Sequence, residues 1–326
     1  MRAVVCDAWT EPDGLKIGDL PSPALEPGQV RLRVHAVGVN FADTLMVAGK
    51  YQVKPEFPFA PGLECAGEVA ELGPGVTELK VGQRVMAISR FGGSYAEELI
   101  TTPDYVIPIP DEMDFVTAAS FPVVYGTAHF ALTHRGDLKP GETLLVTGAA
   151  GGVGLAAVEI GKQLGATVIA AAGSDEKLQT AKAHGADHLI NYTTESIRDR
   201  VKAITNDNGL DVLFDPVGGD AFEQAFRAVN WQARLLIIGF AAGRIQQVPA
   251  NHILVKNVSV IGVVWGAQAA RDPAVVTAGL REMLAWWQDG KLKPHVAKTF
   301  PLADASAAMN ALLSRAYPGK IVLTCD

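Results

Sequence analysis

The sequence predicts an α/β fold in which a doubly wound parallel sheet is inserted into a mainly β domain. From about residue 143 onward, short apolar strands alternate with amphipathic helices, which is typical of a parallel sheet covered on both faces. Residues before about 120 instead combine strand patterns with Pro and Gly clusters. The C-terminal part returns to mixed strand and helix. We therefore expect a split domain at residues 1–124 and 266–326 around an inserted domain at residues 125–265.

The split domain is expected to be irregular and largely antiparallel. Residues 30–36 alternate between apolar and polar side chains, the period of a half-buried strand. A second sheet-forming run covers residues 82–88. Near the C-terminus we expect helices at about 273–288 and 302–315, and strands at about 295–300 and 320–324.

A helical stretch is expected at residues 114–134, across the boundary of the inserted domain, and Pro122 and Gly126 should kink it or divide it into two helices. Six strands should follow, at residues 143–147, 167–172, 188–192, 211–215, 233–238 and 258–264. Helices between the first five are expected at about 153–164, 176–184, 196–205 and 221–229.

Composition and charge exclude several classes of protein. The formal net charge is −7 and no run of Lys or Arg occurs, which argues against a nucleic-acid partner. No apolar stretch reaches the ~20 residues of a membrane helix, and the N-terminus resembles no targeting signal. The three cysteines are widely spaced, as suits a reducing compartment. We therefore expect a cytoplasmic protein that is not bound to a membrane.

A glycine turn after the first strand of the inserted domain predicts a dinucleotide site. The strand is followed by Gly148, Gly151, Gly152, Val153 and Gly154 at the start of a helix. Glycines allow the backbone to approach a pyrophosphate, and the N–H groups of the helix N-terminus favour an anion. The spacing differs from G-x-G-x-x-G, so the strand and helix context carries the prediction; a purely structural turn is the alternative.

The end of the next strand predicts which dinucleotide is bound. NAD-preferring sites usually carry Asp or Glu there, to hold the ribose 2′-hydroxyl. Here the strand ends in Gly173 and Ser174, which leave room for a 2′-phosphate, and Lys177 follows one helical turn later. Asp175 and Glu176 keep NADH open as the alternative, and Lys177 could also be a solvated helix residue. We expect NADPH.

Several segments resemble the medium-chain dehydrogenase/reductase superfamily. They are residues 38–43, 61–67, 82–85 and 319–323, together with the glycine turn. Asn-Phe-x-Asp at 40–43 and Val-Tyr-Gly-Thr-Ala at 124–128 resemble the zinc-independent quinone oxidoreductase branch, which includes zeta-crystallin. The resemblance implies a Rossmann sheet inserted in a GroES-like catalytic domain.

The sequence departs from the alcohol dehydrogenase pattern where that pattern binds zinc. Asn40 stands at the position of a cysteine ligand, and Gly62-Leu63-Glu64 replaces Gly-His-Glu. Asn is a poor zinc ligand and Leu is none, so we expect no zinc. Without a Lewis acid, the chemistry has to rest on hydride transfer from the cofactor and on positioning by neutral groups.

The resemblance implies three catalytic candidates. Asn40 should lie beside the nicotinamide and bond substrate or cofactor, or else serve a local turn. Asp43 should orient neighbouring groups, or else cap the short helix that starts there. Tyr51 should donate a proton or hydrogen bond to the substrate oxyanion, or else pack against Phe57 and Phe59.

Further cofactor contacts follow from the same resemblance. Thr127 should approach the nicotinamide ribose, and Tyr192 should lie near the adenosine phosphate beside Lys177. Residues at or beyond the ends of the later strands should also contact the cofactor, although each could simply belong to core or turn. They are Val217, Gly239, Phe240, Val264 and Trp265.

These observations predict an NADPH-dependent reductase of quinones or other α,β-unsaturated carbonyl compounds. An enoyl-CoA reductase is one alternative; Arg90, His134, Arg135 and Arg244 are scattered candidates for a basic rim. A non-enzymatic, crystallin-like NADPH-binding protein is another. The β-branched edge strand near residues 258–264 predicts a homodimer, because pairing two such edges covers both.

Overall fold

The computed structural model describes residues 1–325, which form two compact units. Of the described residues, the first unit comprises 1–123, 268–284 and 294–325, and the second comprises 124–267 and 285–293. The α/β fold with a parallel sheet inserted in a mainly β domain is confirmed. Among the described residues, no helix combines the length and apolarity needed to cross a membrane.

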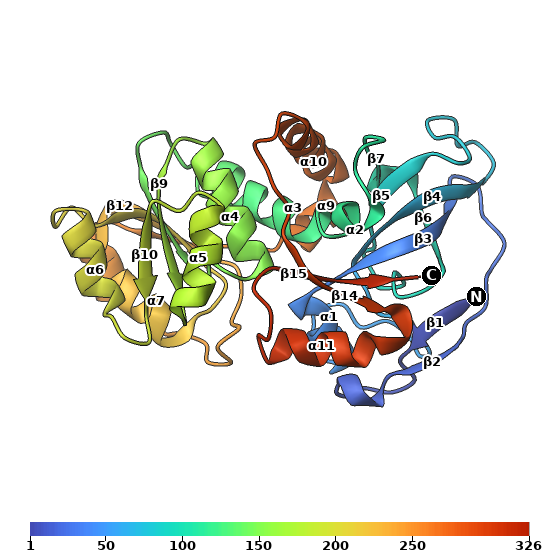
Figure 1. Ribbon diagram of the computed structural model, residues 1–326, viewed down its shortest axis with the longest axis horizontal. Coiled ribbons are helices and arrows are strands. Elements are labelled where there is room, and N and C mark those ends of the chain that lie inside the picture. Colours follow the sequence, from blue (N-terminus) through green and yellow to red (C-terminus); the bar gives the residue numbers. More distant parts are fainter. Residues whose placement is uncertain (326) are drawn as a thin grey trace. The chain divides into compact units, whose positions relative to one another are not determined.

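The first unit is built on a seven-stranded sheet with the order β14-β15-β3-β4-β5-β7, to which β6 adds by pairing with β3 (Figure 1). All pairs except β14 with β15 are antiparallel. The strands are β3 (Val30–Val39), β4 (Glu64–Leu72), β5 (Arg84–Ile88), β6 (Glu98–Thr101), β7 (Val106–Pro108), β14 (Val296–Pro301) and β15 (Lys320–Thr324). A separate hairpin-like pair joins β1 (Arg2–Val5) to β2 (Lys16–Asp19).

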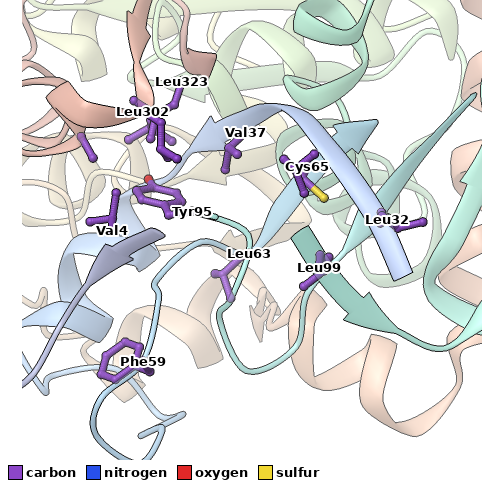
Figure 2. Packing of buried hydrophobic residues seen from close by; sticks show 14 of the residues in the cluster. Val4, Leu32, Val37, Phe59, Leu63, Cys65, Tyr95, Leu99, Leu302 and Leu323 are labelled. Carbon is purple, nitrogen blue, oxygen red and sulfur yellow. The ribbon is translucent and has the colours of Figure 1, made fainter. Parts of the chain in front are cut away.

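Short helices surround this sheet: α1 (Phe41–Val47), α2 (Phe115–Ala119) and α11 (Ala305–Leu313). The core beneath them is apolar and draws on segments far apart in the sequence. Figure 2 shows Leu63 and Cys65 of the β4 region with Tyr95, Leu302 and Leu323 in one buried cluster. This cluster holds β3, β4 and β15 in fixed register, so it also fixes the polar groups at their ends.

The second unit contains a six-stranded, wholly parallel sheet with the order β10-β9-β8-β11-β12-β13. The order reverses direction next to β8, the arrangement that creates a ligand site at the carboxyl ends of strands. The strands are β8 (Thr143–Thr147), β9 (Thr167–Ala172), β10 (His188–Asn191), β11 (Leu210–Asp215), β12 (Val229–Ile237) and β13 (Ser259–Gly262).

Helices cover both faces of this parallel sheet. They are α4 (Gly152–Gln163), α5 (Asp175–Ala183), α6 (Ile197–Ile204), α7 (Gly219–Phe226) and α8 (Ala250–Lys256). Leu145 of β8 packs with Val201 of α6 and Phe222 of α7. The adjacent Leu144 points to the opposite face, where it lies against Gly161 of α4. The predicted alternation of strands and helices is therefore confirmed.

The division of residues 114–134 into two helices is also confirmed. α2 ends at Ala119, and α3 (Pro122–Phe130) starts at Pro122, which lacks the N–H that a continuing helix would need. A short π-helix, Ala131–Arg135, follows. α9 (Trp265–Arg271) and α10 (Pro273–Gln288) lead back toward β14.

Two strand lengths differ from the prediction. β12 starts at Val229, four residues before the predicted start, because Val229 already pairs with Leu210. The predicted strand at residues 258–264 is too long: β13 has only four residues, and α9 begins at Trp265. Apolar β-branched side chains continue past the end of pairing, so composition alone overestimated the strand.

Candidate active site

The glycine turn lies between β8 and α4, as a pyrophosphate cradle requires. Gly148 has a φ of +57°, and a Cβ there would come within 2.8 Å of Val217. Gly151 is the N-cap of α4, and Gly152, Val153 and Gly154 form its first turn. A Cβ on Gly154 would meet the backbone of Gly148 and Ala149. Glycine is therefore needed sterically, and the first N–H groups of α4 have no carbonyl partner within the helix.

A buried carboxylate, that of Asp215, organises the loop beside this turn. Asp215 ends β11 and has no exposed surface. It accepts hydrogen bonds from the Thr147 hydroxyl and from the N–H groups of Val217 and Gly218, at 3.2 Å and 3.0 Å respectively. Burial raises the pKa of this carboxyl, whereas these donors lower it. Asp215 thus ties the end of β8 to the loop that carries Val217.

The end of β9 brings together the residues predicted to read the adenosine ribose. Ser174 is the N-cap of α5 and accepts from the Lys177 N–H at 3.4 Å. A Cβ on Gly173 would lie 3.4 Å from the Tyr192 hydroxyl oxygen, so these two residues are neighbours. The Asp175 carboxylate accepts from the Asn191 side chain at 2.8 Å. Asp175 thus lies in the first turn of α5 and not at the strand end.

The remaining predicted cofactor residues have varied surroundings. Thr127 is half-buried on α3. Gly239 and Phe240 follow β12, and Val264 is 55% exposed just after β13. Trp265 is buried, and its indole occupies the space that a Cβ on Gly126 would need. The indole of Trp265 is therefore engaged in packing against α3.

Asn40 lies in a buried polar network at the end of β3. Its Nδ2 donates to Glu64 Oε1 at 2.8 Å and to the Gly38 carbonyl at 3.3 Å. The ammonium of Lys320, at the start of β15, donates to Asn40 Oδ1 at 2.6 Å and to the Val39 carbonyl at 3.0 Å. It also forms an ion pair with Glu64 at 2.7 Å. Both groups of the Asn40 amide are therefore engaged within the protein.

Asp43 caps α1 and is fully buried. Its Oδ2 accepts from the Asn40 N–H at 2.8 Å and from the Tyr95 hydroxyl at 3.1 Å, whereas Oδ1 is buried without a hydrogen-bond partner. Burial raises the pKa of Asp43 to about 7, against the lowering effects of the Asn40 N–H and of Lys320. The capping role is confirmed, and the carboxyl can exchange a proton near neutral pH.

Tyr51 lies at the edge of the apolar cluster of the first unit and is half-buried. Burial, and then the charge of nearby Asp43, raise the pKa of its phenol. The rings of Phe57 and Phe59, which were the alternative packing partners, contact Trp9 and each other at centroid distances of 4.5 to 6.1 Å. Because the pKa of the Tyr51 phenol is raised, the phenol stays protonated at neutral pH, as a hydrogen-bond donor must.

Comparison with known proteins agrees with this geometry. Residues 26–111 match the alcohol dehydrogenase GroES-like domain family, and residues 152–281 match the family described as zinc-binding dehydrogenase. The chain is 40% identical to quinone oxidoreductase-like protein 2 homolog of Nematostella vectensis, over 99% of this chain and 88% of that protein. The chain belongs to the quinone oxidoreductase branch of the medium-chain dehydrogenase/reductase superfamily.

Solved structures of this branch share the whole fold. The quinone oxidoreductase of Pseudomonas syringae pv. Tomato DC3000 is 30% identical, with a TM-score of 0.94 over 99% of both chains. The Escherichia coli quinone oxidoreductase, solved in complex with NADPH, is 29% identical, with a TM-score of 0.91 over 100% of both chains.

The name of the zinc-binding dehydrogenase family raises the question of whether these residues fit zinc, and they do not. Leu63 offers no donor atom, and its side chain points into the apolar cluster (Figure 2). The Asn40 amide oxygen already binds the Lys320 ammonium, whose charge would repel a metal ion. In this member of the quinone oxidoreductase branch, a lysine side chain supplies the positive charge next to Asn40 and Glu64.

Sequence reasoning singled out Asn40 and Asp43 but missed four buried polar residues around the predicted sites: Glu64, Tyr95, Asp215 and Lys320. One of these four residues, Lys320, could have been found from the sequence. Lys320 opens the apolar strand Lys320–Thr324, where a charged side chain needs a buried partner. Tyr95 and Asp215 carried no comparable signal, because aromatic and acidic residues are common at strand ends.

Proposed function

We propose that this protein is an NADPH-dependent, zinc-independent reductase that transfers hydride to quinones or other α,β-unsaturated carbonyl compounds. The observation that carries the proposal is the polar network of Asn40, Glu64 and Lys320, in which Asn40 stands where the alcohol dehydrogenase pattern has a zinc-binding cysteine. Without a metal to polarise a simple carbonyl, the suitable substrates are those whose reduced anion is already delocalised. The glycine turn supports dinucleotide binding on independent grounds.

NADPH is favoured over NADH for two reasons. The residues that follow β9 are the small pair Gly173 and Ser174, and Asp175, in the first turn of α5, is held by Asn191. The related E. coli enzyme was solved with NADPH. Lys177 and Tyr192 are the residues proposed to lie near a 2′-phosphate.

Reduction of a quinone or enone needs a proton as well as a hydride, and Tyr51 is the proposed donor. Its phenol is protonated at neutral pH, since its ordinary pKa of 10.0 is raised further by burial and by Asp43. The overall balance is NADPH plus H⁺ plus quinone to NADP⁺ plus hydroquinone.

The decisive experiment measures NADPH oxidation by the purified protein with a quinone, an enone and an enoyl-CoA in parallel. We expect turnover with the quinone or the enone, and a lower kcat/KM with NADH. Preference for enoyl-CoA would favour the thioester alternative, against which Arg244 counts, because Asp220 and Glu223 already pair with it. Tight NADPH binding with no turnover of any acceptor would refute the reductase and favour the non-enzymatic alternative.

We further propose a homodimer formed through the β13 edge of the parallel sheet. Among the strands of the described residues, β13 pairs with β12 alone, so its other side presents unpaired backbone groups. Leu254 and Val255 of the neighbouring α8 are 79% and 70% exposed, an apolar surface that a second copy would cover. Light scattering at micromolar concentration should give twice the chain mass; a monomer mass would refute the dimer.

A further inference from the structure

The orientation of the Asn40 amide follows from the chemistry of its two neighbours. An ammonium can only donate hydrogen bonds, so the group facing Lys320 Nζ at 2.6 Å has to be the amide oxygen. A carboxylate can only accept, so the group facing Glu64 Oε1 at 2.8 Å has to be the NH₂. The reversed amide would place donor against donor and acceptor against acceptor. Lys320 and Glu64 therefore define the polarity of Asn40.

The Asn40 amide uses most of its hydrogen-bonding positions within the protein. The NH₂ group has two hydrogens, and both have acceptors, on Glu64 and on the Gly38 carbonyl. The amide oxygen can accept two hydrogen bonds, and Lys320 supplies one. One acceptor position remains. A ligand that bonds Asn40 without breaking this network has to offer an N–H or O–H donor.

We propose that Lys320 and Glu64 are positioning residues that hold Asn40 as a hydrogen-bond acceptor for the nicotinamide half of NADPH. This inference rests on the proposed function. Quinones and enones present only acceptor oxygens, so they cannot satisfy the remaining position on Asn40. The nicotinamide half of NADPH offers ribose hydroxyls and the carboxamide NH₂. Asn40 therefore recognises the cofactor and does not polarise the substrate carbonyl.

The first test separates an acceptor from a donor by measuring the NADPH dissociation constant without any acceptor substrate. Asn40→Leu removes the acceptor and should weaken binding about tenfold, the value of one hydrogen bond. Asn40→Asp/Glu64→Gln keeps an oxygen at the acceptor position. In this double variant the introduced glutamine can donate to the introduced aspartate while its oxygen keeps the Val123 N–H. The Lys320 ammonium loses its ion pair with residue 64 but keeps the aspartate and the Val39 carbonyl as partners. It should bind NADPH within about threefold of the unchanged protein.

The second test asks whether Lys320 acts through Asn40. Lys320→Met should weaken NADPH binding by a factor similar to that of Asn40→Leu, and Lys320→Arg should recover part of it. Combining Lys320→Met with Asn40→Leu should add little, because both remove the same interaction. Lys298→Met on the neighbouring β14 is the matched control, since Lys298 is exposed.

Three outcomes would overturn the inference. Asn40→Asp/Glu64→Gln could bind NADPH as weakly as Asn40→Leu, which would make Asn40 a donor. Asn40→Leu could leave the NADPH dissociation constant unchanged while raising the quinone KM. Additive effects of Lys320→Met and Asn40→Leu on the NADPH dissociation constant would show that Lys320 does not act through Asn40. Circular dichroism checks folding, and should Lys320→Met not fold, the Asn40 variants still decide. If the unchanged protein does not turn over any acceptor, the proposed reductase activity is refuted. The NADPH-binding measurements still test the role of Asn40, because they use no acceptor substrate.

Discussion

The ammonium of Lys320 lies 2.6 Å from the amide oxygen of Asn40, a residue 280 positions earlier in the chain. Both side chains are buried, as is Glu64, which completes the group. A buried ion pair adds little stability compared with apolar packing, yet breaking one leaves a costly unpaired charge. The network therefore has consequences for stability as well as for function.

Replacing Lys320 by Met should lower the free energy of unfolding by about 3–5 kcal/mol, because Glu64 is left buried without its counter-ion. The double variant Lys320→Met/Glu64→Gln should lose clearly less, since it buries no net charge. Urea denaturation followed by circular dichroism measures both. Lys298→Met should stay within about 0.5 kcal/mol of the unchanged protein. Equal losses in the single and double variants would show that packing and not charge is responsible.

Asp43 should make stability depend on pH in a specific direction. Its pKa rises from 3.8 to about 7 on folding because the carboxyl is buried, so folding takes up a proton between these values. The free energy of unfolding should therefore fall as pH rises from about 4 to 7. Asp43→Asn should flatten this dependence. Asp104→Asn is the control, because Asp104 is exposed. If the free energy of unfolding of Asp43→Asn varies with pH in parallel with that of the unchanged protein, Asp43 is not the group responsible.

Replacing Gly154 by Ala should abolish measurable NADPH binding. The added Cβ would lie 2.8 Å from the Ala149 Cα and closer still to the Gly148 carbonyl, so the backbone of the cradle has to move. Fluorescence titration with NADPH measures the effect. In Gly262→Ala the new Cβ would meet nothing within 4 Å, so this variant controls for the loss of a glycine. Binding by Gly154→Ala within about threefold of the unchanged protein would show that the turn tolerates this movement.

Replacing Ser174 by Asp should shift cofactor preference from NADPH toward NADH. Asp remains a good N-cap for α5, so stability should hold, while its carboxylate repels a 2′-phosphate and accepts from a 2′-hydroxyl. The ratio of kcat/KM for NADPH to that for NADH should fall by at least about tenfold. Ser196→Asp makes the same change at the N-cap of α6 and should leave the ratio unchanged. An unaltered ratio in Ser174→Asp would locate phosphate recognition elsewhere.

Local pattern was sufficient to predict most of the fold. The strand at residues 143–147 and the break before Pro122 agree with the structure, because apolar runs, turn glycines and prolines act over a few residues. The edge strand was overestimated, because backbone pairing and not β-branched composition determines where a strand ends. The relation of Asp215 to the glycine turn was missed, since it depends on β8 and β11 being neighbours across 68 positions.

The sequence by itself determined the alternation of strands and helices, the glycine turn, and the presence of an amide and an apolar side chain at positions 40 and 63. These are properties of residue type and spacing. Only the tertiary structure decided what Asn40 can bond. The antiparallel pairings of β15 with β3 and of β3 with β4 bring residues 320, 40 and 64 together. Hydrogen-bond polarity depends on which partners surround a group, and here the partners Glu64 and Lys320 lie far apart in the chain.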